Sequence, residues 1–199
     1  MVHPVRNTFL AADTHFYHDN IIRHCNRPWS IAEHTDALVA RWNDTVKKGD
    51  LVYHLGDFAM IREQADGAPR MKLYRKLRMR LNGKIVLIMG NHDQMSEEVY
   101  KECFVERYDL KEISIDGIKL TACHFPMRSW NGSFHGRPHV FGHVHGRLEK
   151  VDTGVSCDVG IDVPEYNYAP VSWEVLRVKL LKKYEIFCER YKDSKEDLT

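Results

Sequence analysis

Short clusters of aspartate, histidine and asparagine follow several apolar runs of this sequence, and such side chains can bind metal ions. The clusters read ADTH, LGD, MGNHD, ACHF and FGHVHG. Their polar members are Asp13, His15, Asp57, Asn91, His92, His124, His143 and His145. All of them offer oxygen or imidazole donors and none offers a thiolate, so the set suits manganese, iron, zinc, nickel or cobalt.

The spacing of these residues predicts more than one ion. Asp13 and His15 are two positions apart on a segment that we expect to be extended, so both should face one ion. His143 and His145 repeat this spacing, although each could equally reach a different ion. Without His92 the set has seven candidate ligands, too many for one four-coordinate site. We therefore expect two divalent ions that share a carboxylate.

Two ions roughly 3.5–4 Å apart can hold a phosphoryl oxygen and lower the pKa of a bridging water. His92 follows the candidate ligand Asn91, and we expect it to point at the substrate rather than at a metal. There it could protonate a leaving alkoxide. Asp93, the next residue, could orient the His92 imidazole.

The side chains must be positioned by strands and helices. In the first part of the chain the expected strands alternate with helices, and in the later part the strands follow one another closely. Buried strands are expected over 8–13, 50–57 and 84–93, with strands also over 139–146 and 156–163 and a hairpin over 112–125. Helices are expected over 31–48 (capped by Ser30), 71–81, 96–103 and 172–191. This order predicts an α/β protein with a mixed sheet, or with two sheets packed face to face between helices. Ligands would then converge at the carboxyl ends of strands, where Gly56, Gly90 and Gly142 allow sharp turns or close approach.

Composition narrows the classes of protein. The 199 residues show no repeat or linker, so we expect a single domain over 1–199. The net charge of +1 gives no general basic field, which makes a nucleic-acid partner possible but not favoured. Five scattered cysteines without a CxxC pair, no secretory signal and no apolar run of membrane-spanning length favour a cytoplasmic protein without a membrane partner. No particular oligomeric state is indicated.

The ordered set DTH, GD, GNHD, H and GHVH, from Asp13 to His145, resembles the calcineurin-like metallophosphoesterase superfamily, in particular its small stand-alone bacterial or phage members. The resemblance implies a four-layer α/β/β/α sandwich of two mixed β-sheets flanked by helices, with a dinuclear centre for which we favour Mn²⁺. It implies that Asp13, His15, Asp57 and His145 hold the first ion. Asp57, Asn91, His124 and His143 would hold the second, with Asp57 shared. His92 would be the catalytic histidine.

Further residues could contact a substrate. His18, Asn20 and Arg27 follow the first strand, and Arg128 lies between His124 and His143 in a segment that also carries Trp130, His135 and Arg137. Arginine and an aromatic ring beside phosphate chemistry suggest contacts to phosphate and to a base or sugar. Alternatively, His18 packs or caps a turn, Trp130 packs, and the arginines are solvated.

The leading hypothesis is a metal-dependent phosphoesterase that hydrolyses a small phosphodiester, such as a cyclic nucleotide, by attack of a hydroxide bridging the two ions. A phosphomonoesterase or a nuclease with the same centre is the alternative within enzymes. A non-enzymatic scaffold of the same fold is disfavoured, because all seven ligands and His92 are present.

Overall fold

The computed structural model describes residues 7–61, 70–148 and 154–196, with side chains up to residue 190. Its strands form two mixed sheets. The five-stranded sheet has the order β4 (Glu106–Tyr108), β3 (Lys84–Ile88), β2 (Leu51–His54), β1 (Thr8–Ala11) and β9 (Val171–Ser172). The four-stranded sheet has the order β5 (Leu110–Ile115), β6 (Ile118–Cys123), β7 (His139–Phe141) and β8 (Ser156–Asp158).

Five α-helices and two 3₁₀ helices accompany the sheets in the described part of the chain. They are α1 (Asp19–His24), α2 (Ile31–Thr45), α3 (Arg70–Arg80), α4 (Glu97–Cys103), α5 (Trp173–Glu196), η1 (Ser133–His135) and η2 (Pro164–Tyr166). The structure confirms the predicted α/β sandwich of two mixed sheets flanked by helices.

The central strands of the five-stranded sheet are apolar on both faces. In β1, Phe9 and Ala11 pack toward α2, α3 and α4, whereas Leu10 packs toward the second sheet. β3 repeats the alternation, with Leu87 on the helix side and Val86 between the sheets. A strand buried on both faces needs a continuous apolar run, which is why these segments stand out in the sequence.

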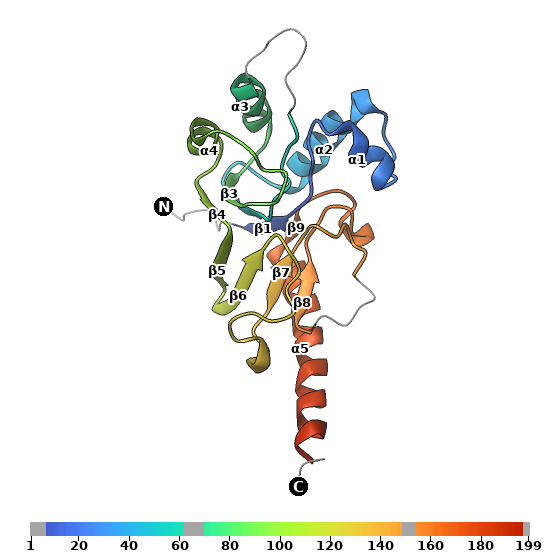
Figure 1. Ribbon diagram of the computed structural model, residues 1–199, viewed down its shortest axis with the longest axis vertical. Helices are drawn as coiled ribbons and strands as arrows, with labels where there is room; N and C mark the ends of the chain where they lie inside the picture. The colour runs from blue at the N-terminus through green and yellow to red at the C-terminus, as the bar shows by residue number, and fades with distance from the viewer. Residues whose placement is uncertain (1–6, 62–69, 149–153, 197–199) are drawn as a thin grey trace.

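A second core fills the space between the sheets. It joins side chains of β1 and β3 to those of β5–β8 and to Trp173, Leu176 and Leu180 of α5. The same helix contacts β1, β8 and β9, and its later part extends away from both sheets (Figure 1). The start of α5 therefore closes one side of the sandwich.

The topology brings the carboxyl ends of six strands to one region. β1, β2 and β3 run parallel in the first sheet, and β6, β7 and β8 run parallel in the second. The two sheets meet where Ala12, just after β1, pairs with Gly160, just after β8. Residues that follow these strands are therefore neighbours in space although they lie far apart in the sequence.

Several local expectations are confirmed. Ser30 and Glu33 form a capping box at the start of α2, and Asp116–Gly117 turn the β5–β6 hairpin. The short elements α1, β4 and β9 were not predicted; each spans six residues or fewer and lacks a recognisable period. No helix among the described residues has the length and apolarity to cross a membrane.

Candidate metal centre

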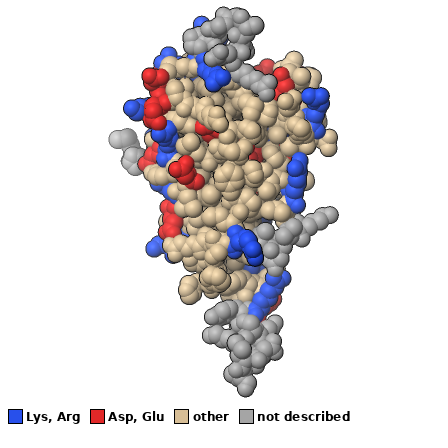
Figure 2. All heavy atoms as spheres, viewed as in Figure 1, with Lys and Arg blue, Asp and Glu red and all other residues tan. Residues whose placement is uncertain are grey.

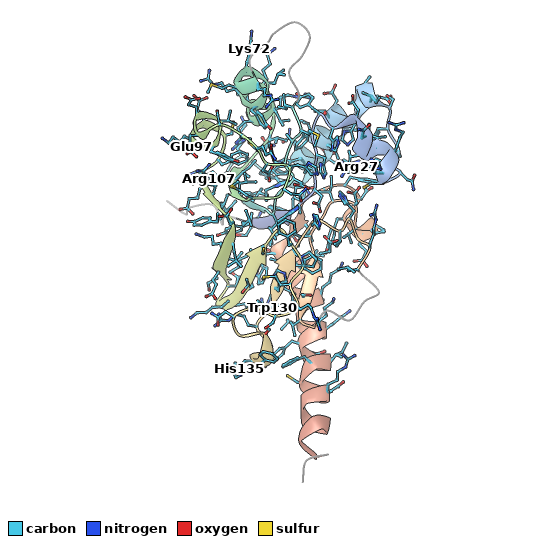
Figure 3. All side chains as sticks on the ribbon, in the orientation of Figure 1. Arg27, Lys72, Glu97, Arg107, Trp130 and His135 are labelled. Carbon is cyan, nitrogen blue, oxygen red and sulfur yellow. The ribbon has the colours of Figure 1, made fainter. Side chains whose placement is uncertain are left out.

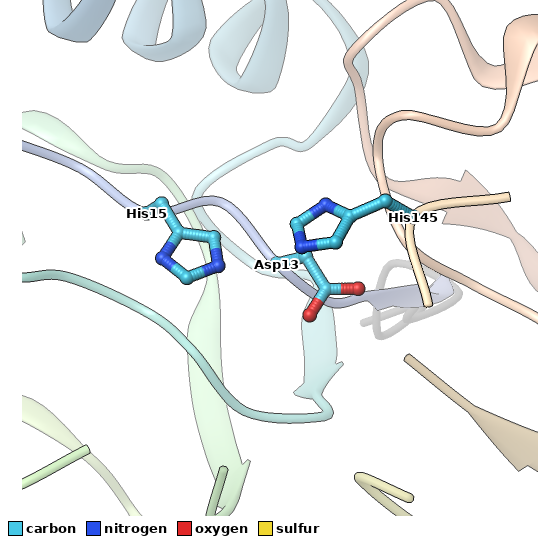
Figure 4. Close-up of side chains that lie close together, drawn as sticks. All are labelled: Asp13, His15 and His145. Carbon is cyan, nitrogen blue, oxygen red and sulfur yellow. The ribbon is translucent and has the colours of Figure 1, made fainter. Parts of the chain in front are cut away.

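Six of the seven predicted ligands form two compact groups at the carboxyl ends of the strands. The first group is Asp13, His15 and His145, which Figure 4 shows converging from two separate segments. The second group is Asp57, His124 and His143. Within each group the possible ligand atoms all lie within 4.8 Å of one another. This division matches the assignment that the resemblance implied.

Asp57, a member of the second group, also faces the first group. Its Oδ2 atom is 3.4 Å from Nε2 of His15 and 3.6 Å from Nε2 of His124. Its Oδ1 atom accepts a hydrogen bond from the backbone N–H of His92 at 2.9 Å. The seventh predicted ligand, Asn91, places Oδ1 3.2 Å from Nε2 of His124, on the side of the second group. One carboxylate oxygen is thus positioned to be shared.

The backbone at these ligands differs from the extended segment we expected. Asp13 and His15 have φ values of +59° and +48°, and His143 and His145 have +71° and +51°. Asp57 also lies in this left-handed region, with φ of +54°. Asp13 and His15 do lie close together, as their i, i+2 spacing predicted. However, their backbone is left-handed rather than extended. Such conformations cost of order 1–3 kcal/mol each and cluster at functional sites.

Glycines permit the close approach of the ligand-bearing loops, as the sequence suggested. A Cβ atom on Gly90 would lie 2.6 Å from the amide nitrogen of Asp57 and would overlap its carboxylate. One on Gly142 would overlap Ala12 and lie 2.9 Å from Oδ2 of Asp13. Neither position has room for a side chain, so glycine is required by the packing of the ligands themselves.

The donor set fits divalent cations. Nε2 of His15 is buried and has no hydrogen-bond partner among the described residues, although it faces Asp57 Oδ2. The carboxylates of Asp13 and Asp57 are both buried, 0% and 2% exposed. Buried carboxylates and an unpaired imidazole nitrogen that face the same space are costly unless a cation pairs with them.

The pKa shifts of most of these side chains agree with a site for divalent cations. Burial raises the pKa of Asp13 well above its ordinary value, only partly offset by the nearby His145. Burial, followed by the charges of Arg27 and His145, lowers the pKa of His15, and burial also lowers that of His124. Neutral imidazoles are the form that binds metals. His145 differs: burial opposes its protonation, but hydrogen bonds to Asp162 and Cys25 raise its pKa to about 10.

Two aspartates near the first group were missed by the sequence reading. Asp158 is buried and accepts hydrogen bonds from the backbone of Gly146 and Gly160, at 2.8 and 2.7 Å. Oδ2 of Asp162 accepts one from Nδ1 of His145 at 2.6 Å. We predicted only a strand for this segment, SCDVGID, in which Asp158 and Asp162 lie two positions before and after Gly160 and so lack the adjacent Gly-Asp pair that marked Asp57.

A cavity of about 640 Å³ opens over both groups. His92 lies in its wall, with its ring 5.5 Å from that of His15, as expected for a group that faces the substrate rather than a metal. His18 and Asn20 also line the cavity. Nδ1 of His18 lies 3.1 Å from Nδ1 of His15, so His18 can fix the orientation of that ligand as well as face the cavity.

Asp93 does not orient the His92 imidazole as we expected. Its carboxylate turns away and accepts hydrogen bonds from the backbone N–H groups of Asp57, Phe58 and Gly90, at 2.8 to 2.9 Å. Asp93 therefore joins the loop after β3 to the loop after β2. Burial, opposed by these hydrogen bonds, raises its pKa to about 7.

The two arginines expected to contact phosphate lie outside the cavity. Arg27 is buried beneath the first group and donates hydrogen bonds to Asp162. Arg128 lines a separate hollow of about 510 Å³ together with Trp130 and residues of α5 and η1. Figure 3 shows Arg27 beside α1 and Trp130 near α5, at distant parts of the molecule. Trp130 packs against the protein, which was the alternative to a substrate contact, and its indole N–H donates to the carbonyl of Arg137.

Several known proteins are similar to this chain in sequence or in structure. The uncharacterized protein MJ1445 of Methanocaldococcus jannaschii is 34% identical over 186 residues, which cover 92% of this chain and 95% of that protein. The structure of the protein of unknown function AQ665 from Aquifex aeolicus superposes with a TM-score of 0.64 at 25% identity, over 86% of this chain and 98% of that one. The nuclease MPE of Pseudomonas putida gives a TM-score of 0.47 at 25% identity, over 71% and 63%.

The model of one protein family, described as calcineurin-like phosphoesterase, matches residues 7–153. This range contains all seven predicted ligands and His92, and it spans well over half of the chain. The protein belongs to the calcineurin-like phosphoesterase family.

Proposed function

We propose that this protein is a metal-dependent phosphodiesterase that hydrolyses a small phosphodiester, such as a cyclic nucleotide. The observation that carries the proposal is the pair of ligand groups, with Asp57 facing both, beneath an open cavity that also presents His92. Two bound divalent ions would supply positive charge against the phosphate oxygens and lower the pKa of a water molecule.

The residues divide this work between holding the ions and handling the proton. Asp13, His15 and His145 would hold one ion, and Asn91, His124 and His143 would hold the other, while Asp57 serves both. His92 is half-buried in the cavity wall, where its imidazole can donate a proton to the departing alkoxide. His18 and Asn20 offer polar atoms on the wall for the rest of the substrate.

The size and openness of the cavity favour a small diester. A volume of about 640 Å³ falls in the range of pockets that take ligands of nucleotide size. Its lining includes the apolar side chains of Ile21 and Met60, so both substituents of a diester find a surface beside the phosphate. A monoester needs only one such surface.

The charge distribution gives less support to a nuclease. Arginines of the basic helix α3 pair with acids: Arg75 with Glu102, and Arg80 with Asp36. On the face drawn in Figure 2, blue and red spheres alternate along one side instead of forming a continuous basic surface. A long nucleic acid is held mainly by such a surface.

A direct comparison of substrates tests the proposal. We expect the purified protein with added Mn²⁺ to hydrolyse an aryl phosphodiester faster than the matching aryl phosphomonoester, and to cleave a cyclic nucleotide faster than single-stranded DNA. A faster reaction with the monoester would replace the proposal by a phosphatase, and preferential cleavage of DNA would replace it by a nuclease. Inactivity toward all four would contradict an enzymatic role.

Metal and compartment are part of the proposal. Manganese is favoured because the groups combine carboxylate and amide oxygens with imidazoles, although iron, zinc, nickel or cobalt suit the same donors. Activity after chelation and reloading with each ion tests this preference. The five cysteines are all free, as is usual in the reducing cytoplasm, which is where we place the protein.

A further inference from the structure

Arg27 is tied to the first ligand group by a set of short hydrogen bonds. Its side chain is fully buried. Nε and Nη2 donate to Oδ1 and Oδ2 of Asp162 at 2.8 and 2.7 Å, the paired geometry in which guanidinium binds carboxylate most strongly. The guanidinium of Arg27 is therefore bound by groups of the protein and cannot reach a substrate in the cavity.

Asp162 also positions a predicted metal ligand, His145. Its Oδ2 atom, which accepts from Arg27, also accepts from Nδ1 of His145 at 2.6 Å. With Nδ1 engaged, Nε2 is the nitrogen of His145 that remains for an ion. Figure 4 shows a ring nitrogen of His145 directed toward Asp13. The carboxylate thus fixes both the rotation and the metal-binding nitrogen of the ring.

The same guanidinium also holds the loop that carries the other two ligands of the first group. Nη2 donates to the carbonyl oxygen of Asp13 at 2.6 Å, and Nη1 donates to that of Thr14 at 2.9 Å. These carbonyls lie between Asp13 and His15, where the backbone adopts the unfavourable left-handed conformation. Hydrogen bonds to a buried cation can stabilise such a conformation.

The second group receives its support elsewhere. Nδ1 of His124 bonds the carbonyl oxygen of Leu55 at 2.7 Å, and the backbone of His143 donates to the carboxylate of Asp13. Within the described residues, no hydrogen bond of Arg27 or Asp162 reaches Asp57, His124 or His143.

We propose that Arg27 and Asp162 are positioning residues for one half of the metal centre, holding Asp13, His15 and His145 in binding geometry. Among the described residues, neither forms a hydrogen bond with the second group, so we expect them to act mainly on the first. This inference rests on the proposed function only in that it takes two ions to be bound.

Asp162→Asn is the sharpest change, because it keeps the shape of the side chain. Oδ1 and Oδ2 both accept hydrogen bonds in the native protein, so the amide must turn its NH₂ toward at least one donor of Arg27. We expect the affinity of one Mn²⁺ site to fall by about 10- to 100-fold, the usual effect of losing a group that hydrogen-bonds a ligating histidine. The other site should keep its affinity.

Titration with Mn²⁺, followed by electron paramagnetic resonance of the free ion, measures both affinities without reference to activity. Asp50→Asn is the matched control, since Asp50 is buried, accepts backbone hydrogen bonds from Asn7 and Lys47, and lies just before β2, at the end of the strand opposite to Asp57. Two unchanged sites in Asp162→Asn, or equal weakening of both, would overturn the inference. A native protein that binds none of Mn²⁺, Fe²⁺, Zn²⁺, Ni²⁺ and Co²⁺ would overturn the proposed function itself, which is a distinct result.

Arg27→Lys provides a second, independent variant should the first not fold. Lysine keeps the charge but cannot make the paired contact, so the same single site should weaken. Arg78→Lys is its control, because Arg78, like Arg27, donates to backbone carbonyls, three in its case, but lies away from the centre. Cadmium NMR adds a spectroscopic check: each of Arg27→Lys and Asp162→Asn should shift one of two resonances, and His143→Ala should shift the other. Displacement of both resonances by Arg27→Lys would contradict the proposed division.

Discussion

The two halves of the metal centre are supported in different ways. In the first, His145 and the loop of Asp13 are held by the side chains of Asp162 and Arg27. In the second, His124 is held by the backbone carbonyl of Leu55. Main-chain support comes with the strand ends themselves, whereas the side-chain network needs residues that are 135 positions apart. The first half is therefore the one that substitution of Arg27 or Asp162 should disturb.

Asp57 is the one ligand that both halves share, so its removal should have the largest effect. In Asp57→Asn, the amide loses the negative charge, and a nitrogen replaces an oxygen either toward the ions or toward the backbone of His92. We expect both ions to bind weakly and turnover to fall by roughly 10⁴-fold, since each ion contributes several kcal/mol to the transition state. Steady-state rates and Mn²⁺ stoichiometry, with Asp50→Asn as control, measure this. Retention of one tight site would mean that the halves do not share Asp57.

His92 separates catalysis from metal binding. Although its neighbour Asn91 lies on the side of the second group, the His92 ring lies beside His15 of the first. We expect His92→Ala to lower kcat by about 10³-fold, within the range for loss of a general acid, while both ions remain bound. His135→Ala, at an exposed position in η1, should leave kcat unchanged. Loss of an ion in His92→Ala would instead make His92 part of the first half.

The contrast between main-chain support and support by distant side chains also explains what the sequence could predict. Strand-end motifs and glycines depend on local chain geometry, and they correctly grouped Asp13 with His15. The family resemblance separated His143 from His145. The expected extended backbone at Asp13 was wrong, because the left-handed turns are imposed by contacts with distant loops.

The errors concern side chains whose partners are far away in sequence. We predicted that Arg27 contacts phosphate, because arginine commonly binds phosphate. In the structure its guanidinium instead donates to the carboxylate of Asp162, which lies on another loop. Asp93 was assigned to its neighbour His92, but it bonds the backbone after β2 instead. Spacing along the chain does not reveal which buried donor will face a carboxylate after folding.

The support of the first half should also be sensitive to acid, because it includes a buried histidine. Nε2 of His34 lies 2.9 Å from Nη1 of Arg27, and since guanidinium can only donate, His34 must accept and be neutral. Burial, followed by the charge of Arg27, lowers the pKa of His34 to about 4. Between this value and the ordinary value near 6.5 the unfolded chain binds the extra proton, so stability falls as the pH decreases through that range.

The expected loss for the metal-free protein is about 2 kcal/mol of unfolding free energy between about pH 7 and about pH 5 from this residue alone, levelling off below the folded pKa. Urea unfolding in the presence of a chelator measures it at each pH. His34→Gln keeps an acceptor oxygen for Arg27 but does not titrate, so its stability should change less with pH than that of the native protein. His135→Gln, at an exposed position, should leave the pH dependence as it is in the native protein. An unaltered pH dependence in His34→Gln would show that acid does not act on the first half through His34.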